Sequence, residues 1–191
     1  MEGLERYVKP AIIVLVVGLV GIVSYFVYQA MFGTSFSNGL YTDNKYGFEI
    51  QLPPDWREMT SEEEEQVTKA QKYNWDVSNR FFATTTTPLQ AAFSVVAIDK
   101  DQNVPVDMVH AAMVKGFSSI PQAEVQLDEV KSIGGFEVHR VGIQILKMQY
   151  VELIFFQCDK GVIMMGFQAM EPVSDATFTG IDAAVASLRK L

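Results

Sequence analysis

The chain has 191 residues, and its 15 Lys and Arg against 23 Asp and Glu give a formal net charge of −8. This length allows one folded domain plus an appendage. The acidic balance argues against nucleic-acid binding, which uses Lys and Arg to neutralise phosphates. A single cysteine, Cys158, excludes an intramolecular disulfide and a cysteine-based zinc or iron–sulfur centre held by this chain alone.

An uncharged apolar run over residues 11–32 predicts a transmembrane helix. Twenty-two residues of helix span about 33 Å, enough for a hydrocarbon core of about 30 Å. Arg6 and Lys9 precede the run, and the next cation is Lys45. The positive-inside rule therefore places residues 1–10 in the cytoplasm and the rest outside, in a periplasm or at the cell exterior.

A cleaved signal peptide is the alternative for this segment, but its apolar core is normally shorter and ends at small residues. Here the residues near the end of the run, 26–30, are mostly bulky. The stripe of Gly18, Gly21 and Ser24 would let a second helix approach closely, so it marks a possible helix–helix contact.

Residues 33–39 are small and polar apart from Phe36 and predict a flexible linker, so the outer domain is expected over 40–191. Alternation and turn signals predict its first half in chain order. The expected elements are a strand over 46–52, a helix starting at Thr60 or Ser61, strands over 81–87 and 91–99, and a helix over 106–120.

The second half reads as four strands separated by tight turns, followed by a helix over 174–191. The strands are expected over 124–133, 136–145, 148–159 and 162–170. The run 150–158 is apolar on both alternating faces, so both faces of its sheet must be covered. The prediction is an α+β fold in which an antiparallel sheet is flanked by helices on both faces, behind one N-terminal transmembrane helix.

The order of elements and three short motifs resemble the PsbP-like family, whose fold is shared with Mog-type Ran-binding proteins and DcrB-like envelope lipoproteins. The opening segment Tyr46–Trp56 (YGFEIQLPPDW) is similar to the start of these domains. The hairpin Ile133–Arg140 is similar to their middle turn, and Ala186–Arg189 to the end of their final helix. The resemblance covers residues 40–191 and implies a PsbP/Mog-like α/β/α sandwich.

The resemblance also implies partner binding, because the better-known members of the family bind other proteins. The lipoprotein members carry a lipid-modified cysteine after the signal segment, and this chain has none there, so its anchor would be the helix itself. In the opening motif, Phe48 and Ile50 are expected to pack inward from an edge strand, with Trp56 at the end of the core.

Glu152 is the unusual acid of the chain, because it interrupts the most apolar strand. It is expected to pair with a cation on a neighbouring strand, Arg140 or Lys147, or to line a cleft. His139 alternates with apolar residues and is expected to face a covered side of the sheet. His110 lies at the border of the apolar stripe of its helix, so a surface or boundary position is expected for it. Sequence spacing shows no convergence of the two histidines into a metal site.

The sequence contains no phosphate-binding loop, no G-x-S-x-G and no H-E-x-x-H motif, and it predicts no cofactor and no bound metal. The leading hypothesis is a non-enzymatic, membrane-anchored extracytoplasmic module that binds another membrane or envelope protein as an accessory or assembly subunit. The alternative is an envelope protein that binds a lipid or small molecule; an enzyme is the third reading. The candidate pocket or interaction residues are Glu152, His139, Arg140 and Trp56.

Overall fold

The computed structural model describes residues 33–70, 76–85, 91–170 and 175–191. Residues 34–191 form one unit by their contacts. No helix in the described ranges is long and apolar enough to cross a membrane. The predicted span 11–32, with Gly18, Gly21 and Ser24, lies outside the described residues.

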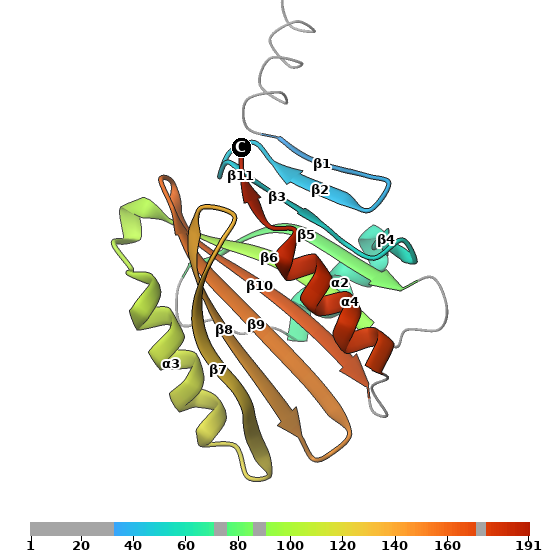
Figure 1. The fold of residues 1–191 in the computed structure, drawn as a ribbon, viewed down its shortest axis with the longest axis vertical. Helices are drawn as coiled ribbons and strands as arrows, with labels where there is room; N and C mark the ends of the chain where they lie inside the picture. Colours follow the sequence, from blue (N-terminus) through green and yellow to red (C-terminus); the bar gives the residue numbers. More distant parts are fainter. Residues whose placement is uncertain (1–32, 71–75, 86–90, 171–174) are drawn as a thin grey trace, which may run out of the picture. The chain divides into compact units, whose positions relative to one another are not determined.

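The main sheet has seven antiparallel strands in the order β4-β5-β6-β10-β9-β8-β7 (Figure 1). Its strands are β4 (Trp56–Glu58), β5 (Ser78–Thr85), β6 (Ala91–Asp99), β7 (Ala123–Ile133), β8 (Phe136–Ile145), β9 (Gln149–Cys158) and β10 (Gly161–Met170). The last four confirm the four strands predicted from alternation. Strands β8, β9 and β10 are buried over most of their length, which agrees with a sheet covered on both faces.

A second sheet, which the sequence did not predict, has the order β1-β2-β3-β11. Its strands are β1 (Thr34–Ser37), β2 (Leu40–Asp43), β3 (Phe48–Gln51) and β11 (Arg189–Lys190). The expected linker over 33–39 is therefore wrong for its central part, because β1 pairs with β2 in an antiparallel hairpin. The one aromatic of that segment holds it in place: the rings of Phe36 and Phe81 lie 5.0 Å apart.

Two further expectations about this region are corrected. β3 is an inner strand between β2 and β11, and not an edge strand. The expected helix over 174–191 is shorter, because α4 (Asp175–Ala186) ends before Ser187, whose hydroxyl accepts a 2.8 Å hydrogen bond from the Gln51 amide. The chain then turns, and Arg189 pairs with Glu49 of β3 instead of continuing the helix.

The helices cover both faces of the main sheet, as predicted. The helix α3 (Val106–Ser118) packs on one face, where Val109 and Phe155 belong to one apolar cluster. Helix α4 and the small sheet cover the opposite face, where Val185, Phe48 and Phe156 belong to a second cluster. The chain also contains a short 3₁₀ helix, η1 (Lys100–Gln102).

The helix α2 (Ser61–Ala70) begins where the sequence predicts. Thr60 and Glu63 form a capping box, in which the Thr60 amide donates to Glu63 Oε2 (2.8 Å) and the Glu63 amide donates to Thr60 Oγ1 (3.4 Å). Arg57 donates two further bonds of 2.8 Å to the same carboxylate. The hydrogen bonds from Arg57 are the main reason why the pKa of Glu63 falls to about 2.

Glycine is required at the turn between β7 and β8. Gly134 has φ of +57°, and a Cβ at this position would lie 1.8 Å from the Leu188 carbonyl oxygen. The Gly134 carbonyl accepts a 3.0 Å hydrogen bond from the Lys190 amide. This close approach joins the end of the chain to the main sheet.

Candidate functional site

The predicted partnership of Glu152 with Arg140 is confirmed. Arg140 on β8 donates from Nε to Glu152 Oε1 on β9 at 2.8 Å, and its Nη2 lies 2.6 Å from the same oxygen. Both residues are buried, with Glu152 at 2% exposure and Arg140 at 8%. A buried ion pair of this kind is stable only when its other hydrogen-bonding groups are also satisfied.

Three residues that sequence reasoning missed complete this cluster. Arg140 Nη2 donates to Asp182 of α4 at 2.6 Å, and Nη1 contacts Glu129 of β7 at 3.3 Å. The Tyr150 hydroxyl donates to Glu152 Oε2 at 3.1 Å. Asp182 and Glu129 carry no sequence signal for this role, since their proximity depends on the helix docking and on the strand register.

Gly142 makes room for the tyrosine of the cluster. A Cβ at Gly142 would lie 2.5 Å from the Tyr150 hydroxyl oxygen, so a larger residue would displace this hydroxyl from Glu152. Gly142 is also the register partner of Glu152 across β8 and β9. The hydroxyl can therefore lie over the neighbouring strand and still reach the carboxylate.

The electrostatics of the cluster are dominated by burial. Desolvation raises the pKa of Glu152, although the charge of Arg140 opposes this shift. Burial and the nearby Glu152 carboxylate also raise the pKa of Tyr150. Desolvation lowers the pKa of the Arg140 guanidinium, but its hydrogen bonds to Asp182 and Glu152 and their charges together outweigh this effect and raise the pKa, so the group stays protonated. The cluster borders a polar cavity of about 460 Å³ between β7–β9 and α4.

His139 lies on the opposite face of the sheet from this cluster. Successive residues of a strand point to opposite faces, so His139 and Arg140 are separated by the sheet. The ring of His139 lies beside that of His110 of α3, with centroids 5.1 Å apart and planes inclined by 56°. His110 is half-buried, and its Nε2 lies 3.0 Å from Asp128 Oδ1, which agrees with the expected surface or boundary position.

Both ring nitrogens of His139 are buried, and neither has a hydrogen-bond partner among the residues that the structure describes. Its Nε2 lies 3.6 Å from Asp107 Oδ1 and 3.6 Å from Glu137 Oε1, too far for hydrogen bonds. Within the described ranges, no three His, Cys, Asp or Glu side chains are placed to hold a metal ion. The histidines and Glu152 are therefore not brought into one site.

Trp56 belongs to the core and not to either cluster. It is 8% exposed, and its ring makes edge contacts with Phe93 and Phe167 at 6.4 and 6.0 Å. The interpretation of Trp56 as a packing residue at the end of the core agrees with this position.

An exposed apolar surface lies at one end of the main sheet, which we call the apolar tip and define as Ile120, Leu146 and Met148. Their exposures are 41%, 53% and 59%. The turn between β8 and β9 carries Leu146 and Met148, and the Leu146 amide donates to the Gln122 carbonyl at 3.1 Å. This bond holds the turn against the connection that follows α3 and contains Ile120.

The backbone at and beside the apolar tip is unusual. Leu146, Lys147 and Gln122 have φ of +56°, +55° and +69°, in the left-handed region that favours glycine and asparagine. The other non-glycine residues with positive φ in the described ranges are both asparagines, Asn38 and Asn103. Strained backbone of this kind persists where function or surrounding structure requires it.

A second cavity, of about 280 Å³, lies on the α3 face between α2 and α3. Its walls are mostly apolar and include Val67 of α2, Met113 and Phe117 of α3, and Leu153 of β9. Gly166 forms part of its floor. This cavity has the composition of a site for an apolar ligand.

Comparisons with known proteins support the fold. No protein-family model and no curated protein sequence matches this chain. Among solved structures, cyanobacterial PsbP (CyanoP) from Synechocystis is similar with a TM-score of 0.55 and 14% identity, over 82% of this chain and 95% of that chain.

Two more distant structures are also similar. LpqN of Mycobacterium tuberculosis, described as involved in cell envelope biogenesis, gives a TM-score of 0.44 at 14% identity, over 74% of this chain and 82% of that chain. A protein from Bacteroides thetaiotaomicron gives 0.44 at 13% identity, over 84% of this chain and 49% of that chain. The similarity to CyanoP shows that the described domain has an α+β fold like that of PsbP.

Proposed function

We propose that this protein is a non-enzymatic, membrane-anchored extracytoplasmic module that binds another membrane protein as an accessory or assembly subunit. The predicted helix over 11–32 is the anchor in this proposal, and the apolar tip is the contact surface. The partner is a membrane protein with an apolar patch on its extracytoplasmic part.

The single observation that carries the proposal is the combination of exposure and strain at the apolar tip. Leu146 is half exposed, so it gains little from burial, and it occupies a left-handed turn position that costs about 1–2 kcal/mol for a residue with a Cβ. A turn selected for stability alone would carry Asn-Gly here. The presence of leucine at this position is explained if another molecule covers its side chain, because burial then offsets the cost of the backbone conformation.

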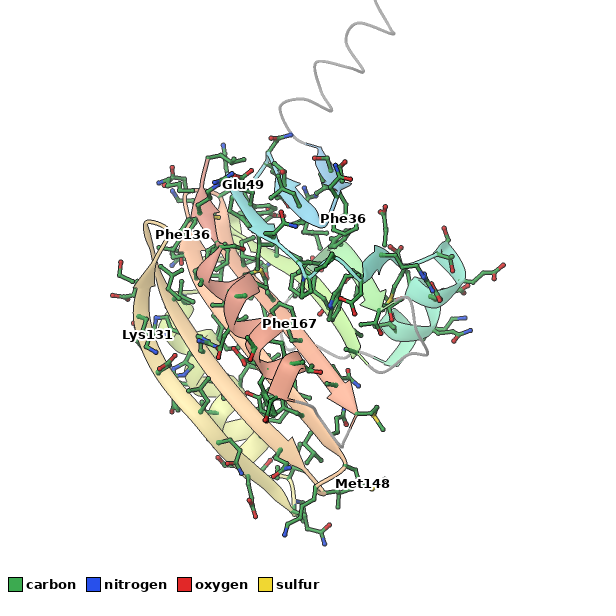
Figure 2. All side chains as sticks on the ribbon, turned by 45° about the vertical axis from the view of Figure 1, so that its right-hand side comes forward. Phe36, Glu49, Lys131, Phe136, Met148 and Phe167 are labelled. Carbon is green, nitrogen blue, oxygen red and sulfur yellow. The ribbon has the colours of Figure 1, made fainter. Side chains whose placement is uncertain are left out.

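The place of the tip in the domain favours a protein over the lipid around the protein's own anchor. Met148 lies at the end of the domain opposite Phe36 (Figure 2). Phe36 belongs to β1, which directly follows the segment that contains the predicted anchor. In this proposal the tip lies away from the domain's own attachment point, and a membrane protein that extends from the membrane is the partner that reaches it.

Site-specific photo-crosslinking in the native membrane tests the proposal. A photoreactive amino acid is placed at Met148 of the full chain, and the matched control carries it at Asp101 of η1, which is exposed on a different part of the domain. We expect one adduct of defined mass from Met148, containing an integral membrane protein, and none from Asp101. The substitution Leu146→Asp should abolish the adduct, and Asp101→Lys should not.

Three results would contradict the proposal. Adducts with lipids alone would show that the tip contacts the bilayer and not a protein. Equal adducts from both positions would indicate random collision. Retention of the Met148 adduct after Leu146→Asp would show that the tip does not contribute to the contact.

A second candidate function is the binding of a lipid or other apolar small molecule in the cavity between α2 and α3. Its volume of about 280 Å³ and apolar walls carry this candidate. Dodecanoic acid is a suitable probe, and its binding to the full chain in a non-competing detergent can be followed by calorimetry. Leu153→Trp should fill the cavity and remove binding, while Met148→Trp, at the exposed tip, should leave it unchanged.

A further inference from the structure

The outermost strand of the main sheet, β7, has a free edge. It is the last strand in the sheet order, and no strand among the described residues pairs with its outer side. Val130, near its middle, is 51% exposed although it is apolar. A long edge strand with unpaired backbone groups is a template for pairing with another strand.

The regular part of β7 is short and well defined. A bulge interrupts its pairing with β8 between Val125 and Leu127. From Leu127 to Ile133 the register continues without a break, and this stretch has Val130 at its centre. The bulge bends the strand, so an added strand can follow only Leu127–Ile133.

This stretch is complementary to itself in one antiparallel register. When two copies pair about Val130, each residue faces the one at the same distance on the other side of the centre. The pairs are Val130 with Val130, Glu129 with Lys131, Asp128 with Ser132, and Leu127 with Ile133. Apolar side chains then face apolar ones and an acid faces a base, which stabilises cross-strand pairs.

Neighbouring registers are unfavourable. A shift that centres the pairing on Glu129 places two carboxylates directly opposite each other, and a shift to Lys131 opposes two ammonium groups. Lys131 Nζ now lies 2.6 Å from Glu129 Oε2 within the same strand. In the paired register, Glu129 and Lys131 of one copy can form two equivalent salt bridges with Lys131 and Glu129 of the other. Lys131 lies on β7 at the edge of the main sheet (Figure 2).

We infer that a second copy of this chain pairs with β7, antiparallel and centred on Val130, and joins the two main sheets into one continuous sheet. The partner is another copy rather than an unrelated strand, because two antiparallel copies of Leu127–Ile133 place apolar residues opposite apolar residues and Glu129 opposite Lys131. Such an interface is isologous and closes as a dimer. It is separate from the apolar tip, so it goes beyond the proposed function and can fail independently of it.

Cysteine crosslinking in membranes tests this inference on the full chain. Residues directly opposite in an antiparallel pair have Cα atoms about 4.5–5.5 Å apart, within disulfide range. Val130→Cys should therefore form a disulfide-linked dimer on mild oxidation. Asp128→Cys and Ser132→Cys should each give none alone, because four residues of strand separate the two copies of either position by about 14 Å.

A mixture provides the internal control. Chains carrying Asp128→Cys, co-expressed with chains carrying Ser132→Cys, should form the crosslinked dimer that neither forms alone. In detergent without oxidant, Val130→Lys should lose the dimer measured by light scattering, while Val125→Lys, beyond the bulge and 40% exposed, should keep it.

The inference is overturned if Val130→Cys yields no dimer, or if Asp128→Cys alone crosslinks as readily as Val130→Cys. It is also overturned if the mixed Asp128→Cys and Ser132→Cys chains do not crosslink. Circular dichroism of each variant, equal to that of the unchanged protein, establishes that a lost dimer reflects the edge and not unfolding.

Discussion

The turn between β8 and β9 should become more stable when its two left-handed residues are replaced by residues that tolerate this conformation. The Met148 amide donates to the Ile145 carbonyl at 3.0 Å, and both central residues of this turn, Leu146 and Lys147, have positive φ. The change is Leu146→Asn with Lys147→Gly. Asparagine and glycine are the residues that a turn with two positive φ angles favours.

The magnitude follows from strain and chain entropy. A residue with a Cβ in the left-handed region costs about 1–2 kcal/mol, and asparagine relieves part of this cost. Glycine removes this conformational cost completely. It also loses more backbone entropy on folding, which costs about 0.5–1 kcal/mol. The double variant should therefore gain about 1–2 kcal/mol in the free energy of unfolding, or roughly 3–6 °C in Tm for a domain of this size.

The assay is thermal and denaturant unfolding of the full chain in detergent, followed by circular dichroism. Met148→Asn is the matched control, because Met148 is exposed in the same turn but is not among the residues with positive φ. It should leave Tm unchanged. An unchanged or lowered Tm for Leu146→Asn with Lys147→Gly would refute the argument that this turn is strained.

Three further predictions concern the described clusters. Glu152→Gln should lower the free energy of unfolding by about 3 kcal/mol in denaturant titration, because it breaks a buried pair while Arg140 keeps its other carboxylates; no change would contradict this. His139→Phe should raise it by about 1–3 kcal/mol, since two buried nitrogens without partners are removed, and a loss would show that they are satisfied in solution. The lowered pKa of Glu63 stabilises α2 above about pH 4.5, and this contribution is lost as the pH falls toward 2, so the protection factors of the α2 amides, corrected for the intrinsic pH dependence of exchange, should fall over that window. In Glu63→Gln, this fall in the protection factors should be smaller.

The pairing of Glu152 was predictable because of its surroundings. A single acid in a strand that is apolar on both faces must find a cation, and Arg140 was one of the two nearby cations on adjacent strands. Strands β3 and β5 to β10 and the helix α3 were predictable for a similar reason, because burial imposes a period of two or of about 3.6 residues on the side chains.

Other features had no signal in the side-chain pattern. β11 depends on a contact between Arg189 and Glu49, which lie 140 residues apart in sequence. The two cations of β11, Arg189 and Lys190, are also the residue types favoured in the last turn of a helix, so the sequence predicted a longer α4. The strand over 34–37 was missed because small polar residues are typical of linkers, and the side chain that packs this segment against the core is a single aromatic, Phe36.

The apolar tip was the least predictable part of the candidate site. Leu146 and Lys147 do not have the composition of a turn with two positive φ angles, so neither the strain nor the exposure was visible in the sequence. Both are backbone properties that depend on how the hairpin is closed and on the hydrogen bond to Gln122. The separation of His139 from Arg140 depends in the same way on the face to which each residue points.

The most direct test of the central claim compares photo-crosslinking from Met148 in the unchanged turn and in the Leu146→Asn, Lys147→Gly variant, in the same membranes. If the apolar tip is retained for partner binding at a cost in stability, the variant will be more stable and will lose the adduct with the membrane protein. An adduct of undiminished yield from the stabilised variant would contradict the account, because the strained leucine would then serve neither the fold nor the partner.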